Sequence, residues 1–205
     1  IVGSGRCGTT LMRAMLQAHP DAHIPPESRL GPVLKDYHRY SRLPWNALLR
    51  ILLAPLAYER AWALWELALG PLLLELSELP PGAHDLATIL NALYRAHAKA
   101  HKPAATRWGD KSPASTPVLT ELRDVFPDLQ VVHMLRDGRD VVRSYMDVSK
   151  AGLPHFADAW LRGVRAARAF GARHTAQYLE VRYEDLVRDT GPNLQRVASF
   201  LGLPF

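Results

Sequence analysis

The sequence predicts an α/β domain of three layers, α/β/α, with a central parallel sheet between its helices. Short apolar runs such as Gln130–Leu135 alternate with longer segments whose apolar residues recur at helical spacing. A glycine-rich turn, from Gly3 to Gly8, separates the first apolar run from the first helical segment. Strands that alternate with helices in this way are typical of a parallel sheet covered on both faces.

The first half of the chain contains a strand, a helix and a long helical insertion at about 43–101. Prolines and glycines mark most of the breaks, because proline cannot continue a helix or strand and glycine weakens both. The predicted elements of this half are a strand at Ile1–Val2, a helix at Thr9–Ala18, an extended segment at Pro25–Pro26, a new element beginning at Glu27–Arg29, two or three short helices from Pro44 to Leu79 with breaks at Pro55 and Gly70–Pro71, and a helix from its cap Asp85 to about Ala100.

The second half repeats the alternation of strands and helices. Pro127 and Gly138 bound its most apolar run, which predicts a buried strand. The predicted elements of this half are a loop at Thr106–Ser112, a helix at Pro113–Val125, a strand at Gln130–Leu135, helices at Asp140–Val148 and Phe156–Arg173, a strand at Tyr178–Val181 and a last helix at Asn193–Leu201.

The composition indicates one globular domain over residues 1–205, with 48% hydrophobic and 22% charged residues. The net charge of +5 suits an anionic ligand, but the basic residues are scattered, so no nucleic acid is expected as a partner. The single cysteine, Cys7, favours a reducing, cytoplasmic location. Charges and prolines interrupt the Leu-rich stretch, so no integral membrane span is expected. The chain starts without methionine, and we expect truncation at one or both ends.

The segment Gly3–Thr10 lies between a strand and a helix, where backbone amides and a helix N-terminus bind anions. Gly3 and Gly8 have the spacing of a nucleotide P-loop, which predicts a P-loop-like strand, loop and helix. Thr9 stands where that motif has a lysine for the β and γ phosphates, so the predicted nucleotide lacks a γ phosphate. A glycine-rich turn without a ligand is the alternative. Cys7 is interpreted as a small residue of this loop.

Three segments resemble those of sulfotransferases, especially tyrosylprotein sulfotransferases and related bacterial proteins. Gly3–Met12, followed by Ala18–Asp21, resembles the segment that binds a 5'-phosphosulfate. Leu135–Tyr145 is similar to the family's 3'-phosphate segment, and Val181–Leu186 with Phe200–Phe205 resembles its closing segment. The resemblance spans nearly the whole chain, and its first two segments are specific in combination.

The resemblance implies transfer of a sulfuryl group from 3'-phosphoadenosine 5'-phosphosulfate (PAPS), a co-substrate, to an acceptor hydroxyl or amine, without a metal ion. It implies that Arg6 and the loop amides hold the 5'-phosphate, while Arg136 and Ser144 hold the 3'-phosphate and Tyr183 lies near the nucleotide. Ser144 could instead be a solvent-facing helical serine. The candidate donor-binding residues are Arg6, Cys7, Gly8, Thr9, Thr10, Arg136, Ser144 and Tyr183.

The candidate catalytic residues are Glu27, Lys111 and Arg6. Glu27-Ser28-Arg29 is similar to the Glu-Thr-Arg segment that bears the general base in tyrosylprotein sulfotransferases, which implies that role for Glu27. Lys111 matches a family lysine that stabilises the transferring group, and Arg6 would offset charge on the leaving group. The structural alternatives are a helix cap or a partner of Arg29 for Glu27, and a solvated side chain for Lys111 and for Arg6.

Two features of this chain differ from those of other sulfotransferases. Cytosolic small-molecule sulfotransferases have a lysine in the first loop and a histidine base, whereas this chain has Arg6 and Glu27. Family members also usually continue well past the position of Phe205, often with basic residues that help to hold the 3'-phosphate.

Several alternatives stay open at the level of sequence. A P-loop kinase or NTPase is disfavoured by Thr9, and a non-catalytic binding protein of the same fold would bind an acceptor without sulfating it. The acceptor and any homo-oligomer are undetermined. Trp45, Trp62 and Trp65 would suit an acceptor pocket, although aromatic residues at helical spacing are more often core. The histidines are dispersed and are interpreted as surface residues, so no metal site is predicted.

Overall fold

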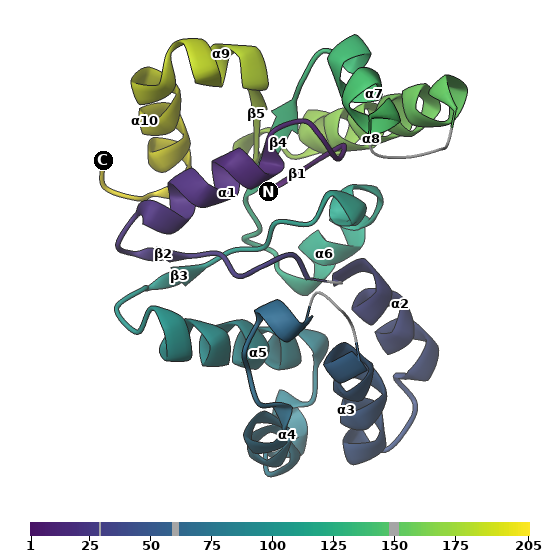
Figure 1. The fold of residues 1–205 in the computed structure, drawn as a ribbon. Coiled ribbons are helices and arrows are strands. Elements are labelled where there is room, and N and C mark those ends of the chain that lie inside the picture. The colour runs from purple at the N-terminus through teal and green to yellow at the C-terminus, as the bar shows by residue number, and fades with distance from the viewer. Residues whose placement is uncertain (29, 59–61, 148–151) are drawn as a thin grey trace. The chain divides into compact units, whose positions relative to one another are not determined.

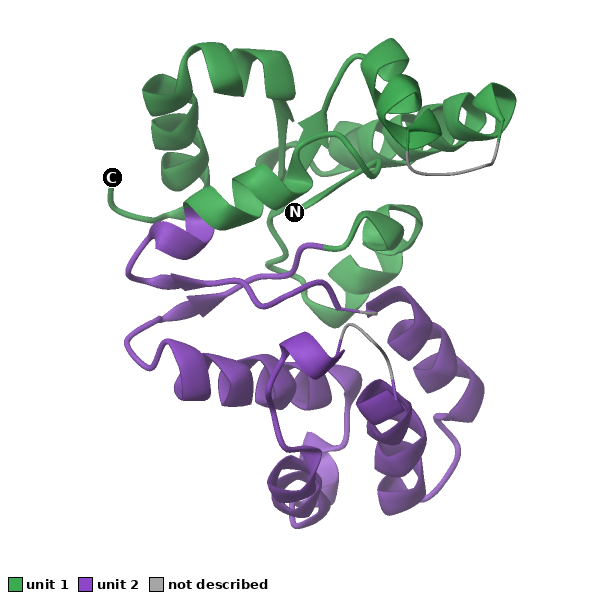
Figure 2. Cartoon of the chain, viewed as in Figure 1, with its two compact units in different colours: residues 1–15, 112–205 green, residues 16–111 purple. Residues whose placement is uncertain are grey.

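The computed structural model describes the chain except for residues 29, 59–61 and 148–151. Its residues form two compact units, unit 1 with residues 1–15 and 112–205 and unit 2 with residues 16–111 (Figure 2). The chain passes from one unit to the other inside its first helix and again between Lys111 and Ser112. Unit 2 therefore begins before, and ends after, the predicted insertion at 43–101.

Unit 1 alternates strands with helices, as Figure 1 labels them. One of its helices, α1, ends with three residues that belong to unit 2. The elements are β1 (Val2–Gly3), α1 (Thr9–Ala18), the 3-10 helix η4 (Pro113–Val118), α6 (Leu119–Val125), β4 (Val131–Leu135), α7 (Gly138–Met146), α8 (Leu153–Arg173), η5 (Thr175–Gln177), β5 (Tyr178–Arg182), α9 (Tyr183–Arg188) and α10 (Thr190–Leu201).

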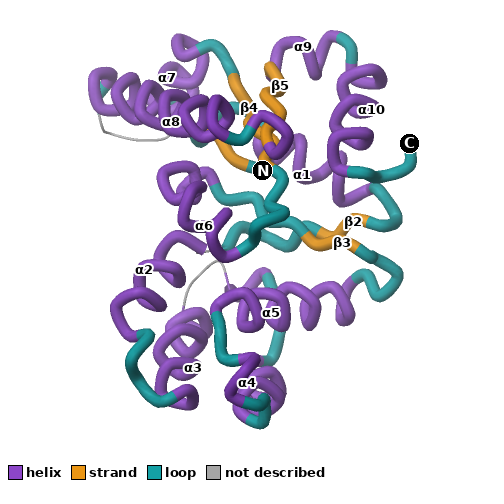
Figure 3. The backbone as a smooth tube through the Cα atoms, turned by 180° about the vertical axis from the view of Figure 1, so that it is seen from behind, coloured by secondary structure: helices purple, strands orange, loops and turns teal. Residues whose placement is uncertain are grey.

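A three-stranded parallel sheet in the order β1-β4-β5 forms the centre of unit 1 (Figure 3). Val2 pairs with His133 in this sheet, and Gly3 pairs with Met134. Successive side chains of a strand point to opposite faces, and residues 131–134 are all buried, so both faces of β4 are covered. The predicted α/β class with a central parallel sheet is confirmed.

The core on one face of this sheet is formed by residues from two strands and two helices. Val2, Leu119, Val131 and Phe170 are buried together, and Tyr178 packs against them. Helix α8 contacts both β1 and β5 and supplies Phe170. Phe170 of α8 therefore packs against both β1 and β4 through this core.

Unit 2 is mainly helical. Its two short strands pair in parallel, with Ala22 opposite Arg107 and His23 opposite Trp108. The elements are β2 (Ala22–His23), α2 (Leu30–Tyr40), α3 (Trp45–Leu53), the 3-10 helices η1 (Ala54–Tyr58), η2 (Trp62–Leu64) and η3 (Pro81–Ala83), α4 (Leu69–Ser77), α5 (Leu86–His101) and β3 (Arg107–Trp108).

Two polar side chains, Asp85 and Lys102, bind at the ends of helices in unit 2. Asp85 caps α5, as predicted, because its side chain accepts a hydrogen bond of 2.7 Å from the backbone N–H of Thr88. At the C-terminal end of α1, the ammonium of Lys102 donates to the carbonyls of Gln17, His19 and Ala22 at 2.5, 2.5 and 2.9 Å. A cation is favoured there because the carbonyls of a last helical turn carry partial negative charge.

Several predicted boundaries differ from the observed ones. Gly70 and Pro71 lie in the first turn of α4, where proline is tolerated because its missing N–H has no partner in any case, so the predicted break is wrong. The predicted helix at Pro113–Val125 is a 3-10 helix followed by α6, with Pro117 inside the first part. The new element predicted to begin at Glu27–Arg29 corresponds to α2, which begins at Leu30, whereas β2, β3 and α9 were not predicted. The predicted end of α7 at Val148 lies outside the described residues.

The interpretation of the histidines as surface residues is wrong for three of them. His23 and His97 are buried, with Nε2 of His23 2.7 Å from Nδ1 of His97, and His133 is fully buried in β4. Across residues 1–28, 30–58, 62–147 and 152–205, no group of three or more His, Cys, Asp or Glu residues could hold a metal ion. No helix within these residues is both long and apolar enough to span a bilayer.

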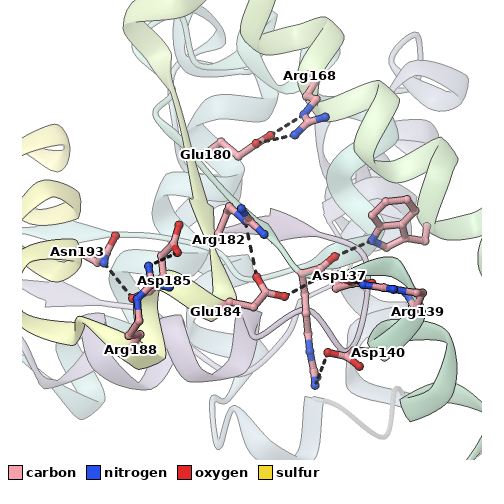
Figure 4. A network of polar contacts seen from close by, with 12 residues as sticks. Asp137, Arg139, Asp140, Arg168, Glu180, Arg182, Glu184, Asp185, Arg188 and Asn193 are labelled. Atoms are coloured by element: carbon pink, nitrogen blue, oxygen red, sulfur yellow. Dashed lines mark hydrogen bonds and ion pairs between the residues drawn. The ribbon is translucent and has the colours of Figure 1, made fainter.

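A polar network on β5 joins the sheet to α8. Arg168 donates two hydrogen bonds to Glu180, at 2.9 and 2.8 Å (Figure 4). The hydroxyl of Tyr178 donates to the same carboxylate at 3.1 Å and lies 2.6 Å from Nδ1 of His133. The Arg168 guanidinium holds the pKa of Glu180 at about 2, below its ordinary 4.5, and burial lowers the pKa of His133 from 6.5.

We expect this network to make the free energy of unfolding fall as the pH decreases. Below pH 6.5 the unfolded chain protonates His133 before the folded chain does, and between pH 4.5 and about 2 it protonates Glu180 first. Stability from both groups is thus present at neutral pH and lost on acidification. In urea titrations, Glu180→Gln should be less stable than the unaltered protein at neutral pH. It should also lose less stability than the unaltered protein on acidification.

The matched control is Glu121→Gln, at an exposed carboxylate of α6. Its free energy of unfolding should depend on pH as that of the unaltered protein does. If Glu180→Gln followed the same curve as this control, Glu180 would not be an acid-sensitive link.

Candidate functional site

The loops that follow β1 and β4 lie at one edge of the sheet in unit 1. This follows from the parallel pairing, because the carboxyl ends of parallel strands meet at the same edge. The first loop has backbone of positive φ at Gly3 (141°), Arg6 (65°) and Gly8 (92°). Such backbone turns successive N–H groups toward a common point, which is the geometry of an anion-binding loop. A non-glycine residue in this region is uncommon, so the conformation of Arg6 is specified by its surroundings.

Two glycines of this loop are required by close packing. A Cβ on Gly3 would collide with the backbone oxygen of Met134, and a Cβ on Gly8 would lie 2.5 Å from Cδ2 of Tyr183. Tyr183, the first residue of α9, therefore packs directly on the loop. The position near a nucleotide that the resemblance implies for Tyr183 stays a prediction.

The side chain of Cys7 packs inside the loop. It is fully buried, and its Sγ donates a hydrogen bond of 2.6 Å to the backbone oxygen of Ser4. Burial raises the pKa of the Cys7 thiol to about 11, so the thiol is neutral at physiological pH. Thr9 is also buried, whereas Thr10 is exposed at the first turn of α1. Any ligand contact from Cys7 in this conformation would thus come from its backbone.

Two arginines and a serine meet beside the loop. Nε of Arg6 donates to Oγ of Ser144 at 2.9 Å, and Nη1 of Arg136 donates to the backbone oxygen of Arg6 at 3.2 Å. The guanidinium of Arg136 also lies 4.7 Å from the ring centroid of Tyr183, which is a cation–π distance. Residues that the sequence assigns to the two ends of one donor therefore form a single cluster in unit 1.

The turn that carries Arg136 is held by side chains on both sides. The indole of Trp160 donates to the backbone oxygen of Arg136 at 3.2 Å. The backbone N–H of Asp137 donates to Glu184 at 2.8 Å, and Asp137 pairs with Arg139 (Figure 4). Hydrogen bonds from Arg139 lower the pKa of Asp137 to about 2. The turn is thereby fixed before any ligand arrives.

The other two candidate catalytic residues form an ion pair in unit 2. Nζ of Lys111 lies 2.6 Å from Oε2 of Glu27. The side chain of Glu27 is 48% exposed, whereas that of Lys111 is 8% exposed, so the lysine is the desolvated partner. Glu27 precedes α2, and Lys111 follows β3. The prediction that both serve one reaction stays a prediction, but the structure brings them together.

Sequence reasoning missed a hydroxyl–carboxylate triad that holds this pair. Ser28 Oγ and the hydroxyl of Tyr94 both donate to Oδ1 of Asp110, at 2.5 and 2.7 Å, and the two hydroxyl oxygens lie 2.8 Å apart. Ser28 is next to Glu27, and Asp110 is next to Lys111. Burial and the Asp110 charge raise the pKa of Tyr94 well above 10.0, so it stays a donor. No spacing pattern links these residues.

Comparison with known proteins identifies the family. The sequence profile described as "Sulfotransferase family" matches residues 1–205. The chain belongs to the sulfotransferase family. Its curated relatives in this family include Protein-tyrosine sulfotransferase 1 of Danio rerio, 28% identical, and Protein-tyrosine sulfotransferase A of Caenorhabditis elegans, 26% identical. The matches cover 100% of this chain but 53% and 50% of those proteins, so this sulfotransferase chain spans about half their length.

Solved sulfotransferase structures share the fold. The sulfotransferase domain of the Synechococcus PCC 7002 olefin synthase matches with a TM-score of 0.61 at 24% identity, covering 100% of this chain and 72% of that domain. The sulfotransferase domain from the curacin biosynthetic pathway matches with a TM-score of 0.63 at 21% identity, covering 100% and 73%. The fold of the chain is therefore that of sulfotransferase domains.

The glycine at position 8 should be sensitive to substitution. Gly8→Ala adds a Cβ at φ 92° against Tyr183, so we expect it to lower the free energy of unfolding. The expected loss is about 1–3 kcal/mol, from backbone strain and displacement of the ring. Urea titration monitored by circular dichroism measures it.

Gly163→Ala is the matched control, because nothing lies within 4 Å of a Cβ at that position inside α8. Alanine there should raise stability by about 0.5–1 kcal/mol, since glycine is unfavourable in a helix. Equal stability of the two variants would contradict the described loop.

Proposed function

We propose that this chain carries the donor site and the general base of a sulfotransferase that transfers a sulfuryl group from PAPS to an acceptor hydroxyl or amine. The observation that carries the proposal is the cluster of Arg6, Arg136 and Ser144 beside a loop of positive-φ backbone. Two guanidinium groups at the N-terminal end of a helix attract a ligand with more than one anionic group. PAPS is such a ligand.

Details of unit 1 fit a nucleotide with separate 5' and 3' phosphates. Nε of Arg136 is buried and has no hydrogen-bond partner within the described residues, so one donor of this fork remains for a ligand. The carboxylate of Asp140 lies 3.9 Å from Nη2 of Arg136. At this distance the carboxylate offsets little of the positive charge of Arg136. Helix α1 has no acidic residue in its first turn to compete with an anion. In the proposal Arg136 and Ser144 bind the 3'-phosphate, and Arg6 with the amides of residues 8–10 binds the 5'-phosphate.

In the proposed reaction, the residues of unit 2 handle the acceptor proton. The acceptor oxygen gains a bond to sulfur while the bond from sulfur to the 5'-phosphate oxygen of PAPS breaks, and that oxygen keeps the electron pair. The acceptor proton passes to Glu27, whose half-exposed carboxylate can reach a ligand. Lys111 holds Oε2 of Glu27 in place and supplies positive charge for the transferring group. Positioning and charge stabilisation thus account for most of the rate.

Arg136→Ala should weaken binding of 3',5'-ADP, the desulfated product, by about 10- to 100-fold, because a charge-assisted fork to a phosphate is lost. Binding of 5'-AMP, which has no 3'-phosphate, should change little. Calorimetric titration of the full-length protein with both nucleotides measures the difference.

Arg143→Ala is the control for this titration, since Arg143 is an exposed arginine of α7, the helix that follows the turn with Arg136. It should bind both nucleotides as the unaltered protein does. If Arg136→Ala lost affinity for both nucleotides equally, the assignment of Arg136 to the 3'-phosphate would be contradicted.

Glu27→Gln should lower the rate of labelled sulfate transfer from PAPS by about 10²- to 10⁴-fold, the usual contribution of a general base. The fold should be kept, because glutamine still accepts a hydrogen bond from Lys111. Binding of 3',5'-ADP should be unchanged.

Glu75→Gln, at an exposed glutamate of α4, is the matched control and should keep full activity. Retention of transfer by Glu27→Gln at the rate of this control would remove Glu27 from the mechanism.

A further inference from the structure

Two aromatic residues of α8, Phe156 and Trp160, lie on the same face of that helix. They are four positions apart in sequence, which places them about 6 Å apart along the helix axis. Phe156 is buried and Trp160 is partly buried. Helix α7 packs against α8 (Figure 1). Each aromatic residue reaches one of the two anion-binding segments of unit 1, Trp160 directly and Phe156 through Tyr145.

Trp160 holds the peptide group that joins Arg136 to Asp137. Its indole N–H donates to the carbonyl oxygen of this peptide group at 3.2 Å, and the N–H of the same group donates to Glu184 at 2.8 Å. The indole ring also packs against Gly138, where a Cβ would lie 3.1 Å from three of its carbon atoms. A peptide group bound at both polar atoms cannot rotate without losing a hydrogen bond. The backbone from which the side chain of Arg136 projects is therefore fixed.

Tyr145 of α7 makes the corresponding contact with the anion loop. Its ring stacks on that of Phe156, with centroids 4.6 Å apart and an angle of 3° between the planes. Its hydroxyl lies so close to Gly5 that a Cβ at this position would collide with it. The preceding residue, Ser144, accepts the hydrogen bond from Arg6. Two consecutive residues of α7 thus contact two consecutive residues of the loop, and stacking on Phe156 opposes movement of the Tyr145 ring away from it.

Resting on the proposed function, we propose that α8 sets the two phosphate positions of the donor through aromatic positioning residues. Trp160 acts on the 3'-phosphate through the backbone of Arg136, and Phe156 acts on the 5'-phosphate through Tyr145 and the loop. The spacing of the two contacts is built into one rigid turn of helix. The spacing of two phosphates on one ribose is likewise set by covalent bonds. A site that holds this spacing before the ligand arrives lowers the entropic cost of binding.

Trp160→Phe tests the contact on the 3' side in the full-length protein. Binding of 3',5'-ADP should weaken by about three- to tenfold, because the hydrogen bond that orients Arg136 is lost while most of the ring contact is kept. Binding of 5'-AMP, which has no 3'-phosphate, should change little. Calorimetric titration with both nucleotides gives the ratio of the two affinities. A ratio equal to that of the unaltered protein would overturn the assignment of Trp160.

Phe170→Leu is the matched control, since Phe170 is another buried aromatic residue of α8 but packs in the core with Val2, Leu119 and Val131. It should lower the melting temperature at least as much as Trp160→Phe does, and it should leave the ratio of the two affinities unchanged. If both variants changed this ratio equally, the effect of Trp160 would be a general loss of stability and the proposal would be overturned.

A double-mutant cycle tests the contact between Tyr145 and Gly5. Gly5→Ala should weaken binding of 3',5'-ADP and of 5'-AMP by about tenfold, because both carry a 5'-phosphate and the new methyl group displaces the loop. Tyr145→Phe removes the hydroxyl with which this methyl group collides, so the double variant should bind both nucleotides more tightly than Gly5→Ala alone. Losses that simply added in the double variant would show that Tyr145 does not position the loop.

The unaltered protein separates failure of this inference from failure of the proposed function. If it binds 3',5'-ADP and transfers labelled sulfate from PAPS, but Trp160→Phe behaves as Phe170→Leu does, the positioning proposal is overturned and the proposed function stands. If the unaltered protein neither binds 3',5'-ADP nor transfers sulfate, both are overturned. In the transfer assay, Trp160→Phe should raise the KM for PAPS more than it lowers kcat, because the 3'-phosphate lies away from the bond that breaks.

Discussion

The parallel pairing of β1 with β4 is the constraint on which the anion site of unit 1 depends. Because Gly3 lies opposite Met134, the loops that follow the two strands leave the same edge of the sheet. The close approach permits no side chain at Gly3, and the positive φ of Gly3 and Gly8 turns the loop back over Met134 and Tyr183. The contacts of Arg6 with Ser144 and Arg136 follow from this path, although 138 and 130 residues separate the partners in sequence.

Asp110 has a comparable role in unit 2. Its carboxylate accepts hydrogen bonds from Ser28 and Tyr94, which joins the segment before α2 to the segment after β3 and to α5. A partly buried carboxylate with two short hydrogen bonds is costly to displace, because its charge would lose both partners where water can replace them only in part. Since Ser28 and Asp110 are the chain neighbours of Glu27 and Lys111, the triad fixes this pair without taking up its functional groups.

Local signals were predictable from sequence, and long-range packing was not. The helix at Thr9–Ala18 and the cap at Asp85 follow from spacing and capping chemistry within a few residues. Strands β2 and β3 have two residues each, too few for an alternating pattern, and their pairing depends on residues 85 positions apart. The family resemblance supplied Glu27 and Lys111 as candidates, but only the structure brings them within 2.6 Å. Tyr94 has the spacing of a core residue, so its hydrogen bonds could not be predicted.

The Glu27–Lys111 pair is the centre of the chemistry proposed for unit 2. Lys111 is buried, and Glu27 supplies most of the negative charge that a desolvated ammonium requires. The same contact orients the carboxylate, because Oε2 is held by Lys111 while the side chain of Glu27 is still 48% exposed. In the proposed reaction, the carboxylate that takes the acceptor proton is therefore held by a partner that itself has almost no other access to solvent, so each member of the pair fixes the other.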